Sequence, residues 1–223
     1  QSLHLRHQQL SEQSSHISAE IIGNTLENMP IWMYHLSDAD NVTASGSPEA
    51  SMLVNGGIHA REWQSPESVT GYMEKLYDGR DNQYIEQYLL ENTNIFLIPV
   101  LNIDGFLQTQ AYHDKTMYVG ESEFGSAYRE GRLRRKNKND VDSDIATDID
   151  NWLGVDLNRN NPPFWATSVS GSSGDPQSIV YHGVAAGSEP ETKALHRAGQ
   201  IADEFGLRFY QDTHSFSQLY FVN

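Results

Sequence analysis

A histidine and a glutamate that could bind one metal ion lie three positions apart. His59 and Glu62 follow two consecutive glycines, and His214 follows a predicted strand at residues 208–213. Side chains three apart on one helical turn can point toward the same ion. Two histidines, one glutamate and an open fourth position are typical of a catalytic zinc site. The spacing alone does not separate metal ligands from ordinary polar loop residues.

Two arginines lie within polar segments of this otherwise acidic chain. Arg135 belongs to the basic segment 132–136, and Arg159 follows Asn158 directly. The planar guanidinium binds carboxylates through two parallel hydrogen bonds. A metal centre beside separate arginines therefore suits a substrate that carries a carboxylate and a scissile carbonyl. Solvated surface arginines are the alternative interpretation for either residue.

Alternating strand and helix patterns indicate how these residues are positioned. Strands are expected at 17–22, 30–36, 51–55, 94–101, 208–213 and 218–222. Helices are expected to begin with Ser65 as the N-cap and at a capping box formed by Ser188 and Glu191. Residues 1–15 are expected to be weakly helical and frayed. This order predicts an α/β fold with a mixed, mostly parallel central sheet flanked by helices. Ligands bind at the carboxyl ends of strands in such folds, here after Asn55, Leu101 and Asp212.

Length and composition limit the class of protein. The chain has 223 residues, a net charge of −15 and no cysteine. The length fits a single domain, and the acidic charge argues against nucleic acid or an anionic membrane as a partner. No apolar segment approaches the roughly 20 residues of a membrane span. Without cysteine, zinc must be held by His, Asp or Glu.

A loop between residues 140 and 150 carries five aspartates. Oxygen-rich clusters can hold Ca²⁺, but this loop lacks the glycine and the final glutamate of an EF-hand. A solvated acidic loop is therefore the preferred interpretation.

Five sequence motifs, in the same order, resemble those of the metallocarboxypeptidase A/B family. The resemblance extends from about Ile22 to the last residue. The motifs are Gly57-Ile-His-Ala-Arg-Glu-Trp63, Arg135-Lys136, Asp156-Leu-Asn-Arg-Asn160, Tyr181-His-Gly183 with Ser188-Glu-Pro-Glu191, and His214-Ser-Phe-Ser-Gln-Leu219.

The resemblance implies a carboxypeptidase-like fold and a role for each matching residue. One zinc ion would be bound by His59, Glu62 and His214. Arg135 would polarise the scissile carbonyl, although the adjacent Arg134 leaves the register open by one residue. The substrate would contact Arg61, Asn158, Arg159, Ser215 and Phe216. The implied activity is hydrolysis of the C-terminal bond of peptides or proteins by a zinc-activated water, in an extracellular or periplasmic location.

The chain departs from the family pattern in two respects. The family's general base follows the segment that matches His214, so we expect it beyond Asn223 and expect the catalytic domain to be incomplete at that side. Glu189 and Glu191 remain candidates for a substitute base. Phe216 stands where many relatives have tyrosine.

The expected absence of the base keeps two other functions open. One is a non-catalytic, zinc-holding domain that binds peptide C-termini, and the other is a zinc deacylase of N-acyl amino acids. The sequence indicates neither the preferred terminal residue nor the oligomeric state.

Overall fold

The fold is described by a computed structural model that covers residues 2–38, 40–82, 84–122, 125–139, 153–168 and 170–215. Of residues 116–122 and 125–130 only the backbone is described. Three features predicted from the sequence lie outside the described residues: the strand at 218–222, the acidic loop at 140–150 and the position of Phe216.

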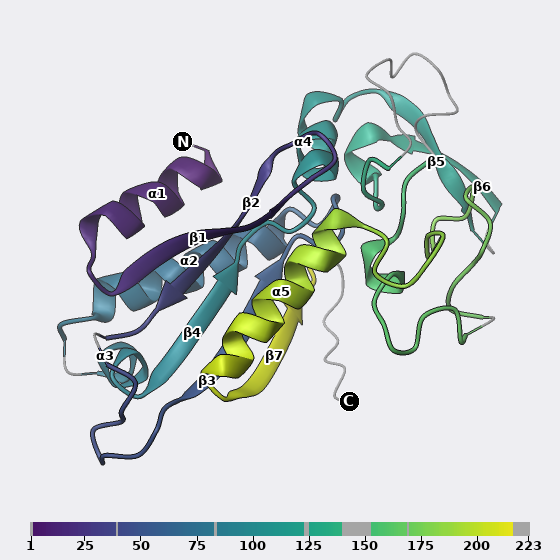
Figure 1. Ribbon diagram of the computed structural model, residues 1–223. Helices are drawn as coiled ribbons and strands as arrows, with labels where there is room; N and C mark the ends of the chain where they lie inside the picture. The colour runs from purple at the N-terminus through teal and green to yellow at the C-terminus, as the bar shows by residue number, and fades with distance from the viewer. Residues whose placement is uncertain are drawn as a thin grey trace.

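The central sheet has five strands in the order β1-β2-β4-β3-β7 (Figure 1). Their bounds are Ile17–Asn24 (β1), Pro30–Leu36 (β2), Ala50–Gly56 (β3), Thr93–Ile98 (β4) and Leu207–Thr213 (β7). Strand β2 pairs antiparallel with both β1 and β4, whereas β3 pairs parallel with both β4 and β7. The predicted α/β class and mixed sheet are therefore confirmed, and the parallel half of the sheet brings three carboxyl ends to one edge.

Helices cover both faces of this sheet. Their bounds are Leu3–Gln13 (α1), Gln64–Gly79 (α2), Ile85–Leu90 (α3), Ile103–Ala111 (α4) and Pro190–Glu204 (α5). Alternate strand residues point to opposite faces. Leu53 and Phe96 accordingly pack with α5 in one core cluster, while Val54 and Leu97 pack with α2 in the other.

The amino-terminal segment was predicted to be weakly helical and frayed; the helix is confirmed, but the fraying is wrong. Residues Leu3–Gln13 form helix α1. Arg6 forms ion pairs of 2.7 Å with Glu67 and 2.8 Å with Glu74, both on α2. The ring of His7 lies 2.8 Å from the hydroxyl of Thr70 and is buried. Contacts with a helix 60 positions further along the chain hold α1 in place, and no local pattern reveals such contacts.

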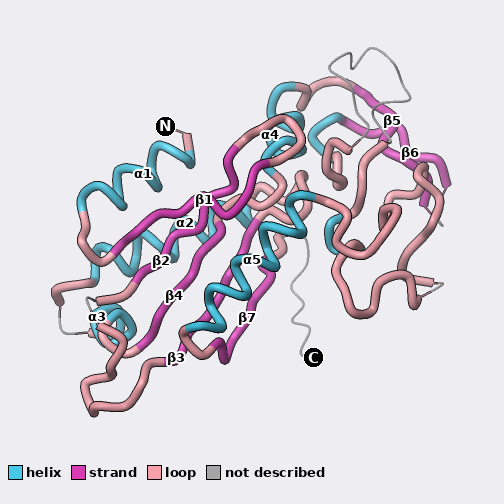
Figure 2. The backbone as a smooth tube through the Cα atoms, viewed as in Figure 1, coloured by secondary structure: helices cyan, strands magenta, loops and turns pink. Residues whose placement is uncertain are grey.

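The long segment between α4 and α5 contains a hairpin. Strands β5 (Thr116–Ser122) and β6 (Gly125–Glu130) pair antiparallel, apart from the central sheet (Figure 2). Among the described residues, two short 3₁₀ helices follow, η1 (Gly131–Leu133) and η3 (Leu157–Arg159). Within the described part of the chain, no helix is long and apolar enough to cross a membrane.

Both predicted helix caps were assigned to the wrong residue. Helix α5 is preceded by Glu189 at the N-cap, without a capping side-chain bond, and Glu191 is bonded to Asn137 instead. Helix α2 begins at Gln64, so Ser65 lies inside it. The Ser65 hydroxyl accepts from the Gly57 amide and donates to the Thr213 carbonyl, two groups at the ends of β3 and β7. Ser65 thus links the two strands that lead to the predicted ligands.

We expect Ser65→Ala to lower the free energy of unfolding by about 1–3 kcal/mol, because it leaves a buried amide and a carbonyl without partners. Urea denaturation measures this change. Ser68→Ala is the matched control, since that exposed hydroxyl donates only to Gln64 one turn earlier and should change stability by less than about 0.5 kcal/mol. Equal losses in the two variants would contradict the linking role.

Candidate metal centre

The three predicted ligands meet at the carboxyl ends of β3 and β7. Strand β3 ends at Gly56, and Gly57 turns the chain with a φ of 66°. His59 and Glu62 lie between this turn and the start of α2. His214 follows directly on β7, whose last residue Thr213 is paired with Gly56. Parallel pairing therefore brings together residues that are 152 positions apart in the chain.

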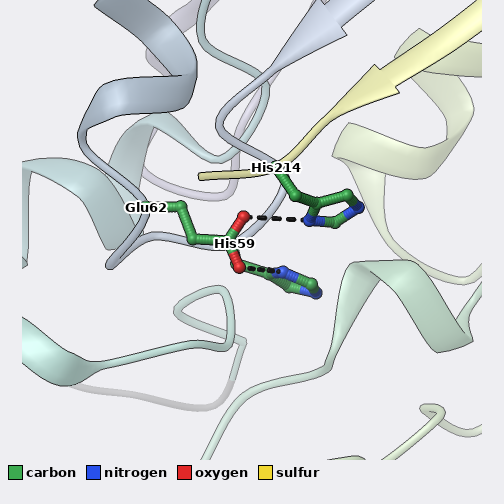
Figure 3. A group of neighbouring side chains, drawn as sticks. All are labelled: His59, Glu62 and His214. Atoms are coloured by element: carbon green, nitrogen blue, oxygen red, sulfur yellow. Dashed lines mark hydrogen bonds and ion pairs between the residues drawn. The ribbon is translucent and has the colours of Figure 1, made fainter. Parts of the chain in front are cut away.

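Glu62 bridges the two imidazole rings (Figure 3). Its Oε1 lies 2.8 Å from Nδ1 of His59, and its Oε2 lies 2.9 Å from Nδ1 of His214. His59 and Glu62 are buried, whereas the side chain of His214 is 33% exposed. The centre is therefore enclosed on the side of α2 and open on the side of His214.

A second carboxylate faces the other nitrogen of each ring. Asp156 Oδ1 lies 3.2 Å from Nε2 of His59, and Asp212 Oδ2 lies 3.0 Å from Nε2 of His214. Asp212 is held in turn by Asn55 on β3, whose amide donates to its Oδ1 over 2.7 Å. Both rings are thus oriented from two sides.

The pKa values reflect these contacts. Burial alone would raise the pKa of Glu62, but hydrogen bonds from His214 and His59 hold it well below its usual range. Burial would likewise raise the pKa of Asp156, and the charge of Arg135 together with the hydrogen bond from His59 lowers it instead. Hydrogen bonds to Asp212 and then Glu62 raise the pKa of His214 to about 10. Glu62 and Asp156 are therefore ionised at neutral pH, so the centre attracts positive charge.

The donor set fits a zinc ion. One ligand atom each from His59, Glu62 and His214 lies within 4.8 Å of the other two. Zinc is bound by imidazole nitrogen and carboxylate oxygen, and a cation can take the place of the protons now shared with Glu62. The outer nitrogens would then donate to Asp156 and Asp212, as metal-binding histidines usually do.

Arg135, rather than Arg134, faces this centre. Its Nε donates to Asp156 Oδ2 over 2.9 Å, and its Nη1 lies 3.4 Å from Nδ1 of His59. Arg134 is buried on the other side, where it donates to the carbonyls of Asn137 and Leu153. The structure thereby removes the one-residue ambiguity in placement, while the role of Arg135 stays a prediction.

Asn158 and Arg159 lie on η3, beside the exposed side of the centre. The side-chain nitrogen Nδ2 of Asn158 is 3.4 Å from Nε2 of His214. Arg159 donates through Nε to the Gly171 carbonyl over 2.6 Å and through Nη1 to the Asn158 carbonyl over 3.0 Å. Both side chains are partly exposed and thus accessible to a ligand.

For the other predicted substrate residues, the structure gives only the position in the chain and the exposure of the side chain. Arg61 lies between His59 and Glu62 in the chain and is partly exposed. Ser215 follows His214 and is also partly exposed. Phe216 lies outside the described residues, so its predicted contact with substrate stays a prediction.

The two glutamates considered as a substitute base belong to a different cluster. Glu189 accepts from Asn137 and Asn139, and Glu191 accepts from Asn137. Burial raises the pKa of Glu191 to about 7. Their described hydrogen bonds do not reach the histidines of the centre.

Two functional residues were given no role by sequence reasoning. Asp156 is the first residue of the motif at 156–160, and its place in that motif was the available signal. Asp212 was noted only as the end of a strand. His214 lies two residues after Asp212, and residues two apart in an extended chain point to the same side. This spacing could have indicated that the two side chains meet.

We expect Asp212→Asn to weaken zinc binding about 10- to 100-fold, because the imidazole of His214 loses the carboxylate that orients it. Competition with a chromophoric chelator measures this affinity. Asp203→Asn, an exposed aspartate on α5, should leave it unchanged. Unaltered zinc affinity in both variants would show that Asp212 does not orient His214.

Known proteins share this fold and sequence pattern. Carboxypeptidase O of Bos taurus is 26% identical over 206 residues, which cover 92% of this chain and 46% of that protein. The metallocarboxypeptidase A-like protein of Trichophyton verrucosum (strain HKI 0517) is 30% identical over 220 residues, covering 97% and 44%. The crystal structure of thrombin activatable fibrinolysis inhibitor has the same fold, with a TM-score of 0.73 at 24% identity, covering 95% of this chain and 45% of that chain.

The chain spans less than half the length of these relatives. A family model described as zinc carboxypeptidase matches residues 6–223. Because this match includes nearly the whole chain, the protein belongs to the zinc carboxypeptidase family.

Proposed function

We propose that this chain is part of a zinc metallocarboxypeptidase that hydrolyses the C-terminal bond of peptides or proteins. The observation that carries the proposal is the convergence of His59, Glu62 and His214 between two groups of substrate-binding type. Arg135 lies on the side of His59, and Asn158 lies on the side of His214. Such a centre can act on a carbonyl while a neighbouring site holds the substrate.

The zinc held by His59, Glu62 and His214 would lower the pKa of a bound water and polarise the scissile carbonyl. Arg135 supplies a fixed positive charge beside it. Because Asp156 accepts from Nε of Arg135, the guanidinium is oriented before substrate binds. A donor positioned in advance at a developing oxyanion is an effective source of catalysis.

Arg159 and Asn158 would bind the substrate's terminal carboxylate. Two hydrogen bonds to backbone carbonyls fix the guanidinium of Arg159, and its Nη2 donates to no residue that the structure describes. A planar guanidinium with free N–H groups binds a carboxylate strongly. The clamp would fit the free carboxylate of a peptide C-terminus and that of an N-acyl amino acid alike. The motifs at 57–63 and 214–219 are what favour an exopeptidase over a deacylase.

The partners and location follow from the same proposal. The substrates would be peptides or proteins with a free C-terminus. An extracellular or periplasmic location is proposed from the family alone.

Peptide mass spectrometry with the whole protein, with and without a zinc chelator, tests the activity. We expect removal of one residue at a time from the C-terminus, stopped by the chelator. A protein that binds zinc and peptide C-termini without cleaving them would instead be the non-catalytic binder considered above.

The zinc site can be tested on this chain, because all three ligands lie within it. We expect His59→Ala, Glu62→Ala and His214→Ala each to abolish tight binding of about one zinc ion, measured by atomic absorption after dialysis. His113→Ala removes an exposed histidine elsewhere and should retain the metal. Stoichiometric zinc in all three ligand variants would refute the assignment.

The carboxylate clamp has a separate test. Replacing Arg159 by alanine should weaken binding of free-carboxylate peptides about 10- to 100-fold, the loss expected for a charge-assisted hydrogen bond of about 1.5–3 kcal/mol. Amidated peptides should be nearly unaffected, since they lack the negative charge. Calorimetric titration measures both, and Arg197→Ala on the exposed face of α5 serves as the control. Equal losses for the two peptides would remove the clamp role.

A further inference from the structure

Three carboxylates gather at the opposite end of β3 from the zinc centre. Asp38 and Asp40 belong to the connection from β2 to β3, and Glu49 immediately precedes β3. One oxygen of each carboxylate lies within 4.8 Å of the other two. The strand between Glu49 and the zinc ligands has seven residues, which at about 3.3 Å each separates the two places by roughly 20 Å.

The carboxylate of Glu49 is buried and only half satisfied. The residue is 7% exposed. Its Oε2 accepts a hydrogen bond of 2.9 Å from the amide of Asn94 on β4. Its Oε1 is enclosed by protein and accepts no hydrogen bond from the described residues. A buried charged oxygen without a partner is costly, so a cation beside this atom would be stabilising.

The described protein supplies no counter-charge for this cluster. None of the three carboxylates forms an ion pair with a lysine or arginine among the residues that the structure places. Arg208 lines the same cavity as Glu49, but no ion pair joins them. Burial, and then the charges of Asp38 and Asp40, raise the pKa of Glu49. Three carboxylates therefore lie close together, and one oxygen of the buried Glu49 lacks a donor.

We propose that Asp38, Asp40 and Glu49 bind a calcium ion. Oxygen donors without nitrogen or sulfur favour a hard cation, and Ca²⁺ accepts six to eight oxygens in irregular geometry. Two oxygens that each lie about 2.3–2.6 Å from one ion are at most about 5 Å apart, which the cluster satisfies. Water would complete the coordination on the side of the exposed Asp40.

The ion would fasten the β2–β3 connection to the sheet. The amide of Asp38 donates to the Leu90 carbonyl at the end of α3, and the amide of Glu49 donates to the Asn41 carbonyl within the connection. A cation shared by both ends of this connection would hold it against β3 and β4. Its role is structural and independent of the proposed hydrolysis.

Thermal unfolding of the zinc-loaded chain in CaCl₂ tests the proposal. With three carboxylates and one exposed side, we expect a Kd of about 10⁻⁴–10⁻³ M. A few millimolar Ca²⁺ should therefore raise Tm by several degrees, because the ion binds only the folded state. MgCl₂ at the same concentration should raise Tm less, since Mg²⁺ demands a stricter octahedral geometry.

Two variants assign the effect to this cluster. Without calcium, Asp40→Asn and Glu49→Gln should be as stable as the parent chain or more stable, because each removes a repelling charge. With calcium, neither should show the rise in Tm. Asp114→Asn, an exposed aspartate away from the cluster, should respond as the parent does. If Glu49→Gln does not fold, the exposed Asp40→Asn carries the comparison.

Each outcome decides the proposal. A Ca²⁺-dependent rise that is lost in Asp40→Asn supports it. The proposal is overturned if Tm does not rise in the parent chain. It is also overturned if Tm rises equally in Asp40→Asn, because the effect would then belong to another acidic segment. His59→Ala should keep the calcium response, so failure of the zinc site and failure of the calcium site give different results.

Discussion

The parallel pairing of β3 with β7 is the constraint on which the site depends. It places Gly56 opposite Thr213, and the segments that follow the two strands supply the metal ligands. Ser65 joins the two strand ends through a single hydroxyl. Since the ligands belong to short segments that begin where hydrogen-bonded strands end, a rigid sheet sets their separation.

Carboxylates lie both between the two imidazole rings and beyond them. Glu62 lies between the imidazoles, while Asp156 and Asp212 lie outside them. Asp156 belongs to both the metal centre and Arg135, because its two oxygens face His59 and the arginine separately. Glu62 and Asp156 are buried, and buried carboxylates are unfavourable unless cations or hydrogen-bond donors surround them. These contacts in turn orient each group.

A buried polar network supports the segment that carries Arg135. Arg134 and Lys136, on either side of it, donate to backbone carbonyls of distant loops, and Asn137 donates to Glu189. Burial lowers the pKa of Lys136 to about 7 and that of Arg134 to about 10. Burying these two basic groups costs free energy, but their hydrogen bonds fix the backbone so that the Arg135 side chain points at Asp156.

Local patterns in the sequence were sufficient for the α/β class and for the strands of the central sheet. They also singled out His59, Glu62 and His214, because residue type and strand-end position are local properties. Only the tertiary structure decided which neighbours these residues have. The side that Arg135 faces, the pairing of Asp212 with His214, the linking role of Ser65 and the docking of α1 all depend on segments far apart in the chain. Hydrophobic periodicity records which face of an element is buried, but it does not record which partner covers that face.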